Sequence, residues 1–143
     1  MKKILYGLCI SISLLVFAGI LIEAYYQVRS NMPGIVRDVR IDIGVSDMFT
    51  QDEIKYAMDV VKETFASQRD SWNRLLELRY EENLSIREAE RRGRDENSTM
   101  VIFAGYYRGQ GFGNEAARAG WFWILVRDSP YDPWKVHGGG KIL

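Results

Sequence analysis

The chain has 143 residues, of which 47% are hydrophobic and 27% charged, and its formal net charge at neutral pH is zero. From Asn31 onward, 16 Lys and Arg against 18 Asp and Glu leave a net charge of −2. Without excess positive charge this part does not attract nucleic acid, so no nucleic-acid partner is expected. Cys9 is the single cysteine and His137 the single histidine. This excludes an internal disulfide and argues against the common metal sites, and we predict no cofactor.

The first predicted element is a membrane-spanning helix. Residues 4–22 carry no charge, and nineteen residues at about 1.5 Å each span roughly 28 Å, close to the hydrocarbon core of a bilayer. Lys2 and Lys3 precede this run and Glu23 follows it. Positive flanks stay cytoplasmic. We therefore expect a signal anchor over residues 1–26, in a single-pass cell-membrane protein with an extracytoplasmic C-terminal domain.

A cleaved secretory signal is the alternative to this anchor. Val16-Phe17-Ala18 resembles a cleavage site, but the apolar run continues to Ile22, longer than such signals need. Tyr25 and Tyr26 then suit the interfacial aromatic belt of a membrane. These features favour the uncleaved anchor.

A short linker and one domain are expected after the anchor. Residues 27–36 read as a juxtamembrane linker that is broken by Pro33-Gly34, and residues 37–143 as the extracytoplasmic domain. Apolar residues alternate with polar ones at the start of this domain and predict its first strand: Val39, Ile41, Ile43 and Val45.

An amphipathic helix is predicted over residues 51–67. Thr50 and Glu53 have the spacing of a capping box, in which each side chain bonds the backbone of the other residue. The apolar residues that follow recur at helical spacing: Ile54, Ala57, Met58, Val61 and Phe65. One face of this helix should therefore pack on a core.

The next predicted elements are a second strand and a short polar helix. Leu76, Leu78 and Tyr80 alternate with charged residues and indicate a strand. A second capping box at Ser85 predicts a helix that ends near Gly93.

Three strands are expected in the last third of the chain. Residues 98–107 and 119–127 are strongly apolar, and Trp134 begins a short strand before the Gly138-Gly139-Gly140 tail. Consecutive strands joined by loops favour antiparallel pairing. The fold class is therefore α+β: a curved antiparallel sheet packed, on one side, on one amphipathic helix plus a short helix.

Aromatic, acidic and basic side chains provide the candidate binding residues. Trp121 and Trp123 share one strand face, where they either line a ligand pocket or fill the core. Tyr80-Glu81-Glu82 places two acids at a strand end, either near a cleft or in solvent. Arg127 ends the most apolar strand. It is expected either to stack on an indole and pair with Glu81 or Glu82, or to lie exposed.

The remaining motifs are weak. His137 has the ordinary pKa for proton transfer near neutrality but stands before three glycines. Residues 109–113 resemble a phosphate loop only superficially, so a hairpin connection is favoured. Residues 91–94 are rich in arginine, but the glutamates one turn earlier indicate a solvated helix face. No catalytic residue is assigned.

Four segments together resemble an uncharacterised family: residues 53–62, 78–82, 121–127 and 134–136. Its members are short exported or membrane-anchored proteins of Gram-positive bacteria with a domain of unknown function. The resemblance covers about residues 45–137, and the strand Trp-Phe-Trp-Ile-Leu-Val-Arg is its most specific part. The chain departs from the family at Glu81, where aspartate is usual, and at its glycine-rich end. The resemblance implies an α+β shape similar to nuclear transport factor 2-like and cystatin-like folds.

Three functions remain open from the sequence. The favoured one is a non-catalytic, membrane-anchored domain that binds a protein or small ligand. The second is a cavity-based hydrolase or isomerase that uses Glu81, Glu82 or His137 as its base. The third is a component of an envelope-spanning secretion or conjugation assembly.

Overall fold

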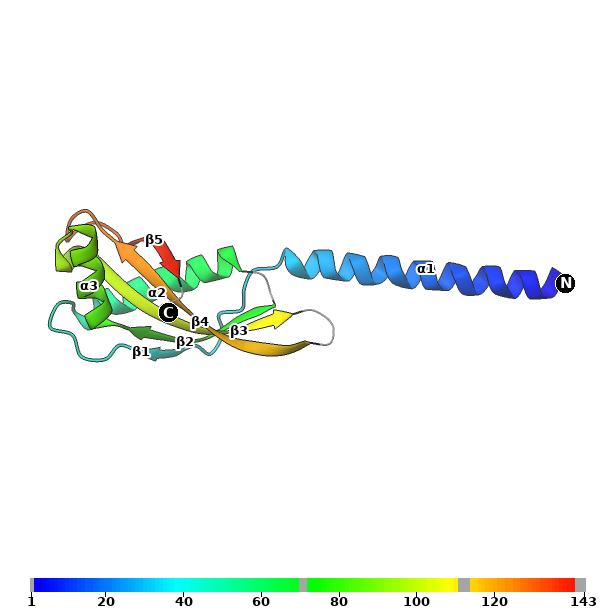
Figure 1. Ribbon diagram of the computed structural model, residues 1–143, viewed down its shortest axis with the longest axis horizontal. Coiled ribbons are helices and arrows are strands. Elements are labelled where there is room, and N and C mark those ends of the chain that lie inside the picture. The colour runs from blue at the N-terminus through cyan, green and yellow to red at the C-terminus, as the bar shows by residue number, and fades with distance from the viewer. Residues whose placement is uncertain (1, 70–71, 111–113, 141–143) are drawn as a thin grey trace. The chain divides into compact units, whose positions relative to one another are not determined.

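The computed structural model describes residues 2–69, 72–110 and 114–140 (Figure 1), without the side chains of residues 2–12, 30, 110 and 114–117. The chain divides into two units, Met1–Met32 and Pro33–Leu143. The boundary between them lies inside the range predicted as a linker.

The first unit is one helix, α1 (Lys2–Ser30). Near its end Arg29 Nη1 donates a hydrogen bond to the Tyr25 hydroxyl at 2.9 Å, one turn earlier. The Tyr25 and Tyr26 rings meet edge to face, with 6.1 Å between centroids. Among the residues that the structure describes, no helix combines the length and the apolarity that a membrane crossing requires.

The second unit is a five-stranded sheet with two α-helices and one short 3-10 helix among its described residues. In chain order its elements are β1 (Arg40–Asp42), α2 (Gln51–Gln68), β2 (Asn73–Tyr80), α3 (Glu82–Arg92), η1 (Glu96–Ser98), β3 (Thr99–Gln110), β4 (Asn114–Val126) and β5 (Lys135–Gly140). The strands lie side by side in sequence order. The α+β class is confirmed.

One pairing differs from the expected antiparallel sheet. Strand β1 runs parallel to β2, whereas β2, β3, β4 and β5 pair antiparallel. Helix α2 connects β1 to β2 and returns the chain to the end of the sheet at which β1 begins. Two parallel strands need a connection of this kind. The sheet is therefore mixed.

Helix α2 covers one face of the sheet as its sequence pattern predicts. The Thr50 side chain caps its N-terminus, and Glu53 completes the capping box. Its buried residues are the five predicted ones: Ile54, Ala57, Met58, Val61 and Phe65. They join a core that includes Leu78, Ile102, Trp123 and Leu125.

The predicted face of β2 is wrong at one position. Leu75 is fully buried and Leu76 only partly, because the register with β3 shifts between Leu75 and Glu77. Such a bulge adds one residue and moves the following side chains to the other face. The alternation of side chains between the two faces of β2, followed from Tyr80 toward the start of the strand, is therefore broken at Leu76.

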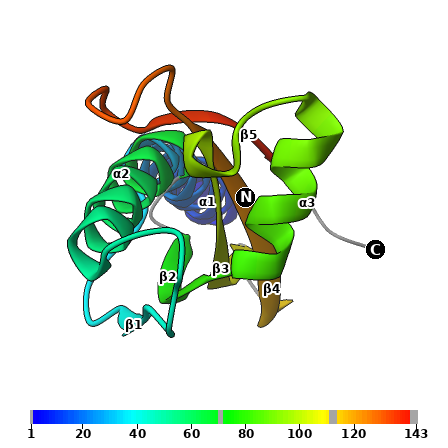
Figure 2. The same cartoon turned by 90° about the vertical axis from the view of Figure 1, so that its left-hand side faces the viewer.

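Helix α3 lies across the sheet from α2, so the expectation of helices on one side is wrong (Figure 2). The apolar second face of β3 and β4, with Val101 and Ile124, needs this cover. Helix α3 begins at Glu82, three residues before the predicted cap at Ser85. The Ser85 hydroxyl instead donates to the Glu81 carbonyl at 2.8 Å and accepts from the Val101 amide at 2.9 Å. This buried serine ties α3 to β3.

Glycines lie at the end of α3 and in β5. Gly93 closes α3 with φ of 60°, as predicted. The expected glycine tail is wrong, because Gly138, Gly139 and Gly140 are part of β5. The register between β4 and β5 shifts from Leu125–Val136 to Ile124–Gly138. His137 is therefore the extra residue of a bulge.

Candidate functional site

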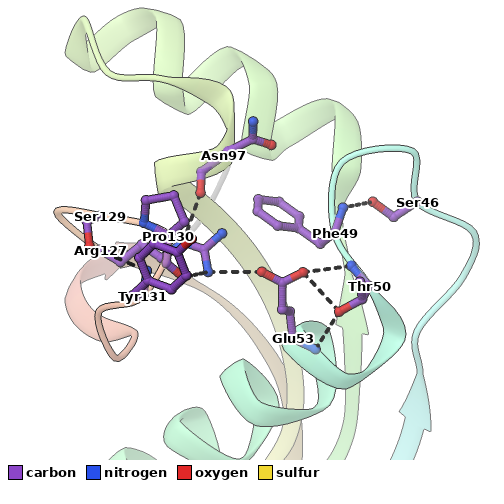
Figure 3. A network of polar contacts seen from close by, with 9 residues as sticks. All are labelled: Ser46, Phe49, Thr50, Glu53, Asn97, Arg127, Ser129, Pro130 and Tyr131. Atoms are coloured by element: carbon purple, nitrogen blue, oxygen red, sulfur yellow. Dashed lines mark hydrogen bonds and ion pairs between the residues drawn. The ribbon is translucent and has the colours of Figure 1, made fainter.

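Arg127 directly follows β4, and its side chain is buried, with a 7% exposed fraction. Its Nε donates to the carbonyl oxygen of Asn97 at 3.0 Å, and its Nη1 donates to that of Pro130 at 3.1 Å. Nη1 also lies 2.9 Å from Oε1 of Glu53 (Figure 3). The guanidinium stacks 4.5 Å from the centroid of the Trp134 ring. One side chain thus joins α2, η1 and the loop before β5.

Glu53 is held from both sides. Its Oε2 accepts hydrogen bonds from the Thr50 amide and hydroxyl, both at 2.9 Å, while Oε1 faces Arg127. Burial alone would raise the pKa of Glu53, but the hydrogen bonds from Thr50 and the ion pair with Arg127 outweigh burial and lower it. This carboxylate is a stable anion and is not free to act as a base.

The burial of Arg127 excludes an exposed strand-end arginine, but its suggested partners were wrong. Glu81 pairs with Arg79 at 2.6 Å, and Glu82 accepts a 3.4 Å hydrogen bond from the Tyr80 hydroxyl. The carboxylate that Arg127 meets belongs to Glu53, 74 residues away in sequence. The stacking on an indole was expected and occurs on Trp134. The Arg127–Glu53 network is a structural clamp, because all its charged groups already have partners.

A second cluster lies at the other end of α2. A cleft of about 230 Å³ opens between this helix end, β4 and β5. We call it the tryptophan cleft, and its defining residues are Gln68, Arg69, Trp121, Trp123, His137 and Gly139. The structure thus brings Trp121 and Trp123 together with His137, which sequence reasoning had treated separately.

The two indoles have different positions in the tryptophan cleft. Trp123 is 4% exposed and belongs to the core, and its Nε1 has no hydrogen-bond partner among the described residues. Trp121 is half-buried, and its Nε1 lies over Gly139, where a β-carbon would overlap it. Each of the two predicted roles therefore applies to one residue: Trp123 fills the core and Trp121 lines the cleft. An unpaired buried N–H is costly unless a ligand or water satisfies it.

Arg69 is the cleft residue that sequence reasoning missed. Its guanidinium lies 5.7 Å from the Trp121 ring and 5.5 Å from the Tyr106 ring. No carboxylate in the described part of the chain comes within 4 Å of it. Its position as the C-cap of α2 was the only available signal. The cleft therefore presents a cation on an aromatic surface.

The predicted acids lie away from this cleft. Glu81 and Glu82 do not line the tryptophan cleft, whereas His137 does. The imidazole makes no hydrogen bond to any residue whose side chain is described. Burial raises the pKa of Tyr80, whose hydroxyl lies 3.4 Å from that of Ser46. Tyr80 is therefore a neutral core residue.

A third feature is the groove of about 320 Å³ between α3 and the second face of the sheet. We call it the α3 groove, and its defining residues are Leu84, Arg87, Arg91, Phe122, Ile124 and Gly140. Glu88 at its rim bonds Arg91 and Arg92, each at 2.6 Å. These bonds lower the pKa of Glu88 to about 2. Arg91 and Arg92 thus belong to a helix surface with internal ion pairs, as predicted. The prediction is wrong for Arg94, which follows the C-cap Gly93 and pairs with Asp128 at 3.2 Å.

Two further expectations concern the loop and metals. Strands β3 and β4 pair antiparallel on either side of residues 111–113, which lie outside the described residues, so the glycine loop itself stays a prediction. In the part of the chain that the structure covers, no cluster of three His, Cys, Asp or Glu side chains could hold a metal ion.

Comparisons with family models, curated proteins and solved structures found no match.

Proposed function

We propose that this protein is a single-pass membrane protein whose α+β domain binds a ligand outside the cell membrane, at the tryptophan cleft. The observation that carries the binding proposal is the convergence of Trp121, Arg69 and His137 on one cleft. Aromatic faces with a few convergent donors are typical of ligand sites. The cleft offers donors and a cation, so the expected ligand carries acceptors or negative charge.

The anchor in this proposal rests on sequence. Residues 4–22 are uncharged, with Lys2 and Lys3 before them and Tyr25 after them. The structure does not describe the side chains of residues 4–12, which make up nearly half of that run. The resemblance to exported and anchored bacterial proteins supports the same location.

Binding is proposed in preference to catalysis. A hydrolase or isomerase at the tryptophan cleft would have to rely on His137, because Glu81 and Glu82 do not line this cleft. A general base usually needs a second group that orients it. Among the described residues none is bonded to the imidazole. The cleft therefore has the features of a binding site more than those of an active site.

Site-specific photo-cross-linking tests the proposal. A photoreactive amino acid in place of His137 should yield a discrete adduct in the cells that make the protein. The same amino acid in place of Glu63, on the exposed side of α2, should yield none. Adding Trp121→Ala to the His137 cross-linker should remove the adduct. Equal labelling from both positions, or none from His137, would contradict binding at this cleft.

A further inference from the structure

Strand β5 forms an edge of the sheet. It pairs with β4 on one side, and no other described strand pairs with its outer side. An edge strand presents unpaired N–H and C=O groups, which another extended chain can pair with. The bulge at His137 interrupts this edge, so regular pairing is available along residues 138–140.

The glycines of this edge leave room for a partner. A β-carbon on Gly138 or Gly140 would meet no described atom within 4 Å, so packing against the described residues does not require glycine at either position. Glycine inside a strand weakens it and often marks the close approach of another backbone. The open space beside Gly140 is the α3 groove.

A cavity borders β5 on each face of the sheet. The tryptophan cleft lies on the α2 face and the α3 groove on the opposite face, and Gly139 lines both. Side chains of an added strand alternate between these two faces. A peptide paired with β5 would therefore place one set of side chains toward each cavity.

The two cavities differ in chemistry. The α3 groove is lined by the apolar side chains of Leu84, Phe122 and Ile124, together with the charged residues Arg87, Glu88 and Arg91. The tryptophan cleft presents Arg69 and His137. Around the edge, Arg69, Arg87 and Lys135 have no carboxylate within 4 Å among the described residues. The surroundings of β5 thus complement an acidic partner.

We infer that the ligand is an extended segment of another protein that adds to β5 as a sixth strand. Its apolar side chains enter the α3 groove, and its alternate, acidic side chains face Arg69 in the tryptophan cleft. This inference rests on the proposed function, because it uses the same cleft. Main-chain hydrogen bonds supply affinity in this mode, and the alternating side chains supply specificity.

A capped hexapeptide that alternates valine with glutamate is the matching probe. Its fluorescently labelled form should bind the full-length chain in detergent micelles and raise the anisotropy in a saturable way. Replacing its glutamates by lysine should abolish binding. Absence of saturable binding, or equal binding of the lysine peptide, would overturn the inference.

Protein variants locate the site. Arg69→Gln should weaken binding about tenfold or more, and Arg69→Lys should restore part of it. Gly140→Val should weaken binding similarly, because the new side chain fills the α3 groove while its β-carbon meets no described atom. An unchanged melting temperature would show that this variant folds. Arg74→Gln, on the exposed side of β2, is the control and should bind as wild type. Equal binding by all four variants would contradict this location.

Backbone methylation tests strand addition directly. In an extended strand the amides of alternate residues point to opposite edges. Methylating the valine amides or the glutamate amides should therefore abolish binding in one peptide and spare it in the other. Equal binding by both would exclude pairing with β5. If the probe fails while cross-linking from position 137 persists, only the strand addition is overturned. If both fail, the proposed function is overturned as well.

Discussion

Arg127 shows how one side chain can hold several segments at once. The guanidinium bonds Glu53, Asn97 and Pro130 and stacks on Trp134, so its removal releases the N-terminus of α2 from the end of β4. Breaking a buried ion pair from one side costs more than replacing both partners, because a charge is left without compensation.

We therefore expect Arg127→Met to lower the free energy of unfolding by about 3 kcal/mol. Glu53→Gln should cost less, and the double variant should cost at least about 1 kcal/mol less than the sum. Urea titration of the four proteins measures this coupling. The exposed pair Arg79–Glu81 is the matched control, with an expected coupling below about 1 kcal/mol. Additive effects for Arg127 and Glu53 would contradict the clamp.

Glu88 should make the stability of the domain depend on acidic pH. Its pKa is about 2 in the folded chain against an ordinary value of 4.5, because Arg91 and Arg92 donate to it. A lowered folded pKa stabilises the domain above the unfolded pKa, and this stabilisation is lost as pH falls from about 4.5 to about 2. The effect should be on the order of 1 kcal/mol, because Arg91 is largely exposed.

The measurement compares unfolding free energies between pH 2 and pH 7. Glu88→Gln should be less stable than wild type at pH 7, and the difference should shrink across this window. Glu90→Gln, on the same helix but in no described ion pair, should follow the wild-type profile. A constant difference between Glu88→Gln and wild type at all pH values would contradict the assignment.

At the scale of elements, α2 was predictable because its information is local. The capping box at Thr50 and the spacing from Ile54 to Phe65 are visible in sixteen consecutive residues, and the structure confirms both. Ser85 carried a similar local pattern, yet a tertiary contact with Val101 placed it inside α3. The bulges at Leu76 and His137 arise from pairing with distant strands, so alternation along one strand could not reveal them.

Phe65 tests the core assignment of α2. Phe65→Ala should cost about 3–5 kcal/mol, because the ring is 1% exposed and packs on Tyr106. Lys62→Ala, one turn earlier on the same helix, loses only a partly exposed pair with Asp59. It should change stability by no more than about 0.5 kcal/mol. Thermal unfolding of both variants tests this assignment. Similar, small changes in melting temperature would mean that the buried face of α2 is misassigned.

At the scale of the whole molecule, the sequence specified the α+β class and the order of elements but not how residues meet. Trp121, Arg69 and His137 lie far apart in sequence, and only the packing of β4, β5 and α2 gathers them into one cleft. The pairing of Arg127 with Glu53 has the same origin. Long-range contacts of this kind leave no periodic signal in the chain.

Membrane topology is the prediction that belongs to this scale. A C-terminal reporter enzyme that works only outside the cytoplasm should be active, and one that works only in the cytoplasm should be silent. The reason is the charge asymmetry of Lys2 and Lys3 before the uncharged run. Sequencing the N-terminus of the purified protein is the companion measurement. A mature chain that begins at Gly19 would replace the anchor by a cleaved signal.

The strands lie side by side in sequence order, and this has a consequence for folding during synthesis. Strand β1 pairs with β2 across 37 residues, between Arg40 and Glu77, while β3 and β4 are consecutive strands that pair antiparallel. Local pairing closes small loops and forms early, whereas distant pairing follows. The core beneath α2 also needs Trp123, Leu125 and Trp134, which lie far beyond α2 in the chain. The apolar face of α2 therefore stays uncovered until β4 and Trp134 have been synthesised as well.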